Sequence, residues 1–148
     1  LPEYSWNQAQ PADCSHLVVI SRPNELDENY VDHYLEHIAT VRKVSVDSLA
    51  AYAGMIKSFT SGPTDLANWM AHQCYIALGT LLTTAAVMGV DACPMEGFDK
   101  AAYNRILGLT EMGLSSVVLC PLGYRASDDK YASQSKVRFP ASELFIRI

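Results

Sequence analysis

The sequence has no apolar run of the ~18 residues needed to span a bilayer. It is also poor in basic residues: 11 Lys and Arg against 16 Asp and Glu give a formal net charge of -5, which argues against nucleic-acid binding. No glycine-rich phosphate loop of the form G-x-x-x-x-G-K-[ST] or G-x-G-x-x-G occurs, and there is no G-x-S-x-G elbow. We therefore expect no membrane or nucleic-acid partner, and no catalytic nucleophile or other catalytic side chain.

Cysteine is scarce as well, and the pattern of the four residues is informative. They are widely spaced, they form no C-x-x-C, and all lie in apolar or helical surroundings: Cys14, Cys74, Cys93 and Cys120. This pattern favours reduced structural thiols in a cytoplasmic protein over a disulfide framework or a zinc site.

The amino-acid composition indicates one folded domain over residues 1–148, because nearly half of the residues are apolar and no linker or repeat interrupts the chain. Strands are predicted at 16–21, 115–124 and 142–148, and helices at 27–42, 46–59, 64–88 and 99–108. Asp27 and Asp99 are predicted N-caps, Pro63 is suited to a first helical position, and Phe98 with Tyr103 is placed as a hydrophobic staple. Short apolar strands interleaved with helices predict an α+β or α/β sheet with helical cover.

The helix predicted at 64–88 is apolar around nearly its whole circumference after Gln73. Such a helix has to be buried on all sides, either in a large core or at a subunit interface. In a chain of 148 residues the interface is the better explanation.

Three groups of residues are candidates for a functional site. His33 and His37 lie one helical turn apart, but the order H-Y-L-E-H is not H-E-x-x-H and no third ligand is evident, so we expect a solvated face and no metal. Lys136 and Arg138 lie on one side of an extended backbone, as a phosphate site requires, although a solvated basic patch has the same pattern. The segment 94–97, Pro-Met-Glu-Gly, is either a plain turn or a backbone that approaches a flat ligand closely at its glycine.

Taken together and in order, several motifs resemble the FMN-dependent nitroreductase family. They are "WMAHQCYIALG" at 69–79, "GVDACPMEGFD" at 89–99, "LGY" at 122–124 and "KVRFP" at 136–140. The sharpest part is the P-M-E-G-F-D turn a short distance after the W-x-x-x-Q-x-Y-x-A-L-G helix. The resemblance covers nearly the whole chain and implies an α+β nitroreductase-like fold, with a central buried helix and an intertwined homodimer.

The resemblance also implies a function and a set of cofactor-binding residues. It implies an FMN flavoprotein that transfers hydride from NAD(P)H through the flavin to nitroaromatics or quinones, by ping-pong turnover and without an obligatory catalytic side chain. Residues matching Pro94, Met95, Glu96 and Gly97 lie beside the isoalloxazine ring, and the backbone N–H at Glu96 donates to flavin N5.

Further roles are implied outside the turn. Lys136 and Arg138 match the FMN phosphate site, and Met55 and Phe59 fall where relatives place side chains beside the substrate. In the family both subunits contribute to each flavin site and the C-terminal strand commonly crosses to the partner, a role that "SELFIRI" at 142–148 would fit.

The resemblance departs from the family at its beginning. Relatives start with an Arg/Ser-rich stretch that clamps FMN and a Ser/Gln/Pro/Trp segment near the ring, whereas "LPEYSWNQAQ" at 1–10 resembles the helix end that follows them. We therefore expect the N-terminal FMN-clamping segment to be missing from residues 1–148. The alternative function is a dimeric, non-catalytic remnant or fragment that does not bind flavin on its own.

Overall fold

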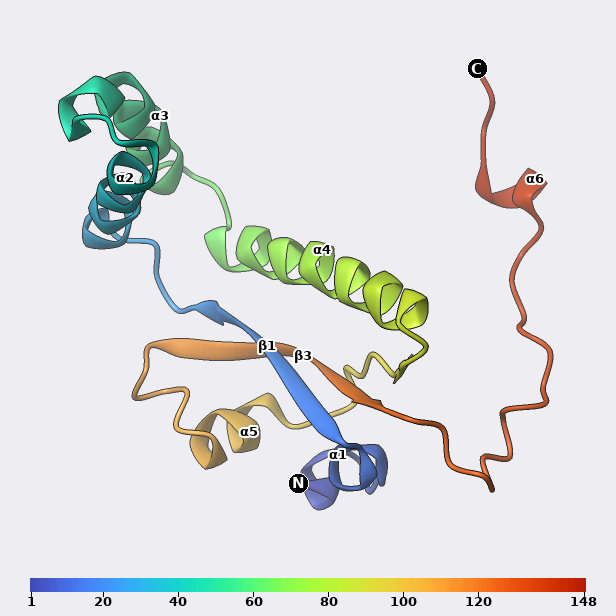
Figure 1. Ribbon diagram of the computed structural model, residues 1–148. Helices are drawn as coiled ribbons and strands as arrows, with labels where there is room; N and C mark the ends of the chain where they lie inside the picture. Colours follow the sequence, from blue (N-terminus) through green and yellow to red (C-terminus); the bar gives the residue numbers. More distant parts are fainter.

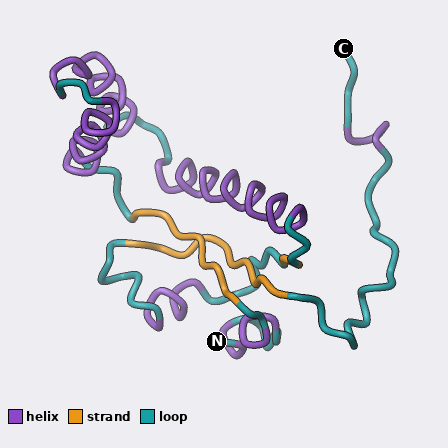
Figure 2. The backbone as a smooth tube through the Cα atoms, viewed as in Figure 1, coloured by secondary structure: helices purple, strands orange, loops and turns teal.

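A small antiparallel sheet organises the computed structural model, which describes all 148 residues. Its strands are β1 (His16–Pro23), β2 (Asp91–Ala92) and β3 (Leu114–Gly123), and β3 is central, in the order β1-β3-β2 (Figure 2). Both long strands contain the apolar runs that predicted them, and each begins or ends within two residues of the predicted bounds. The α+β fold class predicted from the sequence is confirmed.

β1 pairs antiparallel with β3, from His16 opposite Leu122 to Pro23 opposite Leu114. A bulge between Ile20 and Ser21 shifts this register by one residue. Val117 of β3 is the extra residue of this bulge, because it faces no residue of β1. β1 ends beside the N-terminal half of the long helix described next, and from there the chain leaves toward the next helices.

Helices cover the two faces of the sheet unequally (Figure 1). On one face lies the long helix α4 (Leu66–Val87), and on the other lie α5 (Lys100–Ile106) with the N-terminal turns η1 (Pro2–Tyr4) and α1 (Gln10–Asp13). Asp65 caps α4 by accepting the Asn68 backbone N–H at 3.1 Å, so the helix begins at Leu66 and not near Pro63. Despite its length and apolarity, neither α4 nor any other helix meets the requirement for crossing a membrane.

Two apolar clusters form the core, one on each face of β3. Cys74 and Leu78 of α4 pack with Val118 and Cys120 on the first face. On the second face, the partners of the fully buried Leu119 are Met95, Phe98 and Tyr103. The predicted staple is present, since the rings of Phe98 and Tyr103 meet edge to face at 4.9 Å between centroids.

The helical segments between β1 and α4 form a hairpin away from the sheet. It consists of α2 (Glu28–Arg42), the turn η2 (Val46–Leu49) and α3 (Ala50–Thr60). Asp27 caps α2 as predicted, accepting the Tyr30 N–H at 2.8 Å, and Lys57 of α3 pairs with Asp32 of α2 at 2.7 Å. Val41 near the end of α2 is exposed, because the hairpin has only one packed face.

Residues 125–148 form a C-terminal arm that leaves the body of the protein after β3 (Figure 1). The predicted strand over 142–148 is wrong for this structure: the arm has one short helix, α6 (Ala141–Leu144), and no strand. A strand needs a neighbour for its backbone hydrogen bonds, and the arm lies beside no sheet edge. Its apolar side chains Phe145, Ile146 and Ile148 are exposed instead.

Candidate functional site

The segment 94–97 lies at the sheet edge, directly after β2. The Met95 backbone N–H donates to the Leu119 carbonyl at 2.8 Å, and the Leu119 N–H donates back to Met95 at 3.0 Å. The next two backbone N–H groups, those of Glu96 and Gly97, donate to no acceptor in the chain. The structure thus holds Met95 firmly and leaves two adjacent donors available to a ligand.

The Glu96 side chain is fixed from the long helix. The Tyr75 hydroxyl of α4 donates to Glu96 Oε1. Burial, followed by this hydrogen bond and the Glu96 charge, raises the pKa of Tyr75 to about 12. Tyr75 therefore remains a donor at neutral pH, and sequence analysis gave no signal for this contact because the two residues are 21 positions apart.

Gly97 is approached closely by protein rather than by open space. A Cβ placed on Gly97 would lie 2.7 Å from a Trp6 ring carbon, and Gln8 Nε2 donates to the Gly97 carbonyl at 3.5 Å. Trp6 and Asn7 adopt left-handed backbone angles, with φ of 53° and 56°, which bring this segment to the turn. The sequence predicts the close approach of a flat ligand at Gly97, whereas in the structure the Trp6 side chain occupies the space beside this glycine.

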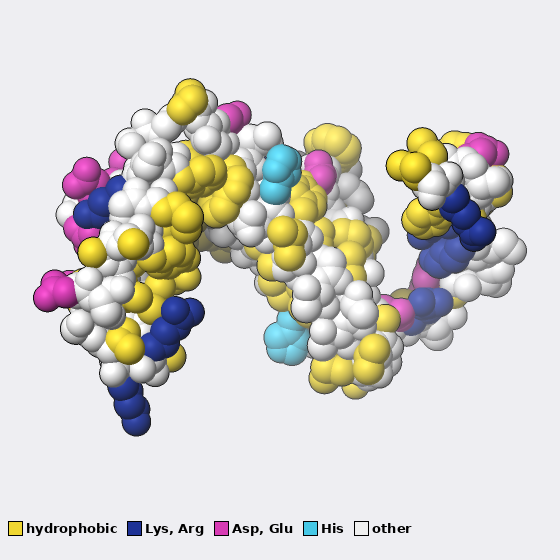
Figure 3. All heavy atoms as spheres, turned by 90° about the horizontal axis from the view of Figure 1, so that it is seen from above, with side chains coloured by type: hydrophobic (Ala, Val, Ile, Leu, Met, Phe, Trp, Pro, Cys, Tyr) yellow, Lys and Arg dark blue, Asp and Glu magenta, His cyan; other side chains and the backbone are white.

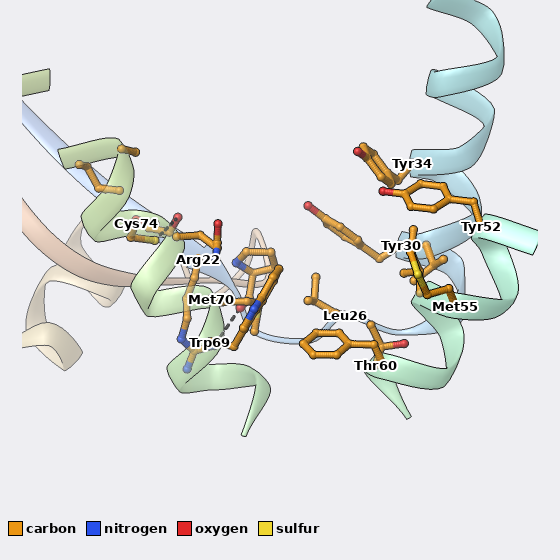
Figure 4. A pocket seen from close by; sticks show the side chains of 18 residues that line it. Arg22, Leu26, Tyr30, Tyr34, Tyr52, Met55, Thr60, Trp69, Met70 and Cys74 are labelled. Carbon is orange, nitrogen blue, oxygen red and sulfur yellow. Dashed lines mark hydrogen bonds between the residues drawn. The ribbon is translucent and has the colours of Figure 1, made fainter. Parts of the chain in front are cut away.

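A groove separates the α2–α3 hairpin from α4 and β1, and its volume is about 760 Å³ (Figure 3). Tyr30, Tyr34 and Tyr52 point into it from the hairpin, facing Trp69 across the gap (Figure 4). Phe59 reaches Trp69 edge to face, at 5.3 Å between ring centroids. The groove is therefore walled mainly by hydrophobic side chains, several of them aromatic, and apolar side chains gather along it in Figure 3.

Met55 and Phe59, the predicted substrate residues, both line this groove. Tyr30 and Tyr34 of α2 line it as well, and both are about half exposed. The polar residues of the groove are few; they include Arg22 of β1 and Gln73 of α4. The structure thus brings the predicted substrate residues together with aromatic residues that sequence analysis did not single out.

The groove and the segment 94–97 lie on opposite flanks of α4. Residues of an α-helix are separated by about 100° around the axis. Gln73 and Ala77 therefore point to the groove, whereas Tyr75, which reaches Glu96, points to the other side. Within one chain, Met55 and Phe59 do not face the turn.

Lys136 and Arg138, the predicted phosphate pair, lie in the C-terminal arm, where Arg138 donates to the Val137 carbonyl at 2.7 Å. Neither contacts the segment 94–97. The arm is tied to the sheet at its base, because Arg125 makes two hydrogen bonds to Asp91, at 2.7 and 3.1 Å. The Arg125 guanidinium, and more weakly the charge of Lys136, hold the pKa of Asp91 below its ordinary value.

The remaining candidates from the sequence show no further chemistry. His33 and His37 are exposed on α2, and no group of three or more His, Cys, Asp or Glu side chains is arranged to hold a metal ion. All four cysteines are free, and burial raises the pKa of the thiols of Cys74, Cys93 and Cys120. These thiols are therefore protonated at neutral pH and act as apolar core groups.

Comparisons with known proteins agree with this architecture. YfkO of Bacillus subtilis is 34% identical over 93% of this chain and 68% of its own length. The oxygen-insensitive NAD(P)H nitroreductase of Enterobacter cloacae is 30% identical over 95% of this chain and 67% of its own length. A protein from Exiguobacterium sibiricum, solved in complex with FMN, shares the fold with a TM-score of 0.76, at 17% identity over 98% of this chain and 68% of its own.

The chain thus spans about two thirds of the length of each of these proteins. The family description "Nitroreductase family" matches residues 7–124, a range that contains the sheet, the α2–α3 hairpin, α4 and the segment 94–97. The chain belongs to the nitroreductase family.

Proposed function

We propose that this chain provides the hydride-transfer site of an FMN-dependent NAD(P)H oxidoreductase that reduces nitroaromatics or quinones. Membership of the nitroreductase family supports the flavin oxidoreductase class, with FMN as cofactor and NAD(P)H as electron donor. The observation that carries the proposal is the pair of backbone donors at Glu96 and Gly97 that bond to no acceptor in the chain, beside the buried centre of β3 at residues 116–121. The four free thiols support a cytoplasmic location as part of the same proposal.

The residues of the turn fit FMN. When bound, FMN supplies the chemistry of accepting and donating hydride, so the protein has to bind and orient it and needs no acid or base of its own. Glu96 and Gly97 offer two adjacent N–H donors, as an acceptor-rich ring edge requires, and Met95 anchors them to β3. Pro94 precedes this anchor and restricts the backbone at the start of the turn.

Lys136 and Arg138 complete the proposed cofactor site as its phosphate-binding pair. A guanidinium and an ammonium are the side chains best suited to a phosphate, the first as a two-pronged donor and the second as a point charge. They lie on an arm that is tied to the sheet only at its base, through Arg125 and Asp91. The proposal requires the arm to bring them against a cofactor, either in its own chain or in a second copy.

A homodimer is the second part of the proposal. The outward face of α4 carries no Asp, Glu, Lys or Arg, and its residues are exposed in the single chain: His72, Ile76, Gly79, Thr80, Thr83 and Val87. Small and apolar side chains without charge are typical of a helix that packs against another helix. Since the groove and the turn lie on opposite flanks of α4, pairing of two α4 helices also allows Met55 and Phe59 of one chain to approach the turn of the other.

The test of the proposal is uptake of FMN by the purified chain. We expect stoichiometric yellow flavin that bleaches on addition of NADH or NADPH under nitrogen, and that returns when a nitroaromatic or a quinone is added. Absence of uptake even after the preceding segment of a relative is fused to residue 1 would contradict the proposal. Sedimentation of a dimer without flavin absorbance would instead favour the alternative, a non-catalytic dimeric remnant.

An Arg138→Ala variant is expected to bind FMN more weakly by about 1.5–3 kcal/mol, the contribution of a hydrogen bond to a charged group. The measurement is titration of FMN fluorescence at fixed ionic strength. Arg42→Ala, which removes an exposed charge from the end of α2, serves as the control and should leave the affinity unchanged. Equal affinities of Arg138→Ala and the unmodified chain would remove Arg138 from the site.

A further inference from the structure

We propose that Tyr75 is a positioning residue for hydride transfer: its hydroxyl, bound to the Glu96 carboxylate, ties the segment 94–97 to α4 and keeps the N–H groups of Glu96 and Gly97 directed away from the protein. This inference rests on the proposed function, because it assigns those two N–H groups to the cofactor. It adds to the proposed cofactor site a residue that lies outside the turn, on the helix α4.

The rigidity of α4 makes Tyr75 a suitable anchor. Its neighbours in the helix, Cys74 and Leu78, are buried against β3 in the first core cluster. The Tyr75 ring is itself about one third exposed, and its hydroxyl reaches past the helix flank to Glu96 Oε1. A well-packed helix therefore fixes the position of the donor, while the acceptor belongs to a turn.

The turn has few other restraints at its exposed end. Met95 is held by two backbone hydrogen bonds to Leu119, but after Met95 only the Phe98 N–H bonds back, to the Glu96 carbonyl at 2.9 Å. The Glu96 side chain makes one hydrogen bond, the one from Tyr75. On the opposite side, Trp6 and Gln8 contact Gly97. Tyr75 thus supplies the restraint on the Glu96 side of the turn, and the N-terminal segment supplies the one on the Gly97 side.

The charge of Glu96 adds a reason for the contact. A carboxylate next to a cofactor that accepts negative charge is unfavourable unless its orientation is fixed and its charge is partly neutralised. The Tyr75 hydroxyl does both, since it donates to the carboxylate and holds it toward α4. No Lys, Arg or His side chain makes an ion pair with Glu96 in this structure.

The experiment uses the full chain and a double-mutant cycle with the variants Tyr75→Phe, Glu96→Ala and both together. One readout needs no cofactor: hydrogen exchange of the Phe98 amide, which donates to Glu96 and reports opening of the turn. The other is the dissociation constant of FMN from fluorescence titration. Glu96→Gln retains an acceptor for the hydroxyl, and Tyr124→Phe removes an exposed hydroxyl without a hydrogen-bond partner as the matched control.

We expect Tyr75→Phe to speed Phe98 exchange and to weaken FMN binding each about fivefold, the size of one ordinary hydrogen bond. Glu96→Ala should behave alike, the double variant should show no further change, and Glu96→Gln should restore most of both properties. If Glu96→Ala acted through a general loss of packing and not through the lost hydrogen bond, Glu96→Gln would not restore the exchange rate and the FMN affinity.

Effects of Tyr75→Phe and Glu96→Ala that add in the double variant, or Phe98 exchange that Tyr75→Phe leaves unchanged, would overturn the role of Tyr75. If no FMN is taken up even after the preceding segment of a relative is fused to residue 1, the proposed function fails, and the exchange cycle still decides whether Tyr75 positions the turn. If FMN binds but its affinity is the same in Tyr75→Phe, the proposed function stands and the positioning role is excluded.

Discussion

Replacement of Leu119 by alanine is expected to lower the free energy of unfolding by about 3–4 kcal/mol, within the range for a fully buried leucine. Leu119 has no exposed surface and packs against Met95, Phe98 and Tyr103 in the second core cluster. Its backbone is hydrogen-bonded to Met95 in both directions. These bonds fix the spacing of the two segments, so they cannot collapse into the cavity that the alanine would leave. Urea denaturation should show a lower midpoint at an unchanged slope.

Val41→Ala provides the matched control for Leu119→Ala. Val41 lies on α2 and is 65% exposed, so its truncation should change the free energy of unfolding by less than about 0.5 kcal/mol. A loss below about 1 kcal/mol for Leu119→Ala would mean that this face of β3 is not a packed core. Because the segment 94–97 is bonded to Leu119, such a result would also remove the rigid support that we assign to the proposed cofactor site.

Local patterns predicted most of the elements of the fold. Asp27 and Asp99 cap helices because each side chain accepts a nearby backbone N–H, which depends on a few neighbouring residues only. Gly89, with φ of 71°, follows the C-cap residue Met88 and ends α4. The start of α4 is less well predicted, because both Pro63 and Asp65 are suited to a helix start. The helix begins after Asp65, whose carboxylate accepts the Asn68 backbone N–H.

The candidate site was predictable only in part. The segment 94–97 carries a Pro and a Gly that mark a special turn, and the resemblance to a family, now confirmed, gave it a role. Its contacts with Tyr75 and Trp6 join residues far apart in the sequence, and no periodicity or motif encodes such contacts. The roles of Pro94, Met95, Glu96 and Gly97 in binding FMN stay predictions.

The C-terminal arm shows why an alternating pattern does not guarantee a strand. In "SELFIRI" the side chains of Leu144, Ile146 and Ile148 recur at every second position, as in a strand with one covered face, although Phe145 between them is apolar as well. The pattern specifies which side chains would be covered but supplies no neighbouring strand and no covering surface. In the single chain those residues are exposed, so the prediction fails for a reason that lies outside the segment.

The second prediction of large effect concerns the helix α4. Ile76→Glu is expected to weaken the proposed homodimer by at least about 1,000-fold, because burial of an unpaired carboxylate in an apolar interface costs several kcal/mol. Ile76 is 64% exposed in the single chain and lies on the uncharged outward face of α4. Its replacement should hardly affect the fold of one chain, since surface substitutions away from special contacts are nearly neutral.

Sedimentation velocity over a range of protein concentrations measures this effect directly. Val41→Glu is the matched control, because Val41 has nearly the same exposure but lies on α2, away from the proposed interface. We expect the unmodified chain and Val41→Glu to sediment as dimers and Ile76→Glu as a monomer with unchanged circular dichroism. Met55 and Phe59 of α3 line the groove on one side of α4, whereas the segment 94–97 lies on the other side. Loss of the dimer should therefore also separate them from the segment 94–97 of the second chain. A dimer that persists in Ile76→Glu would place the interface elsewhere and would leave the exposed face of α4 without an explanation.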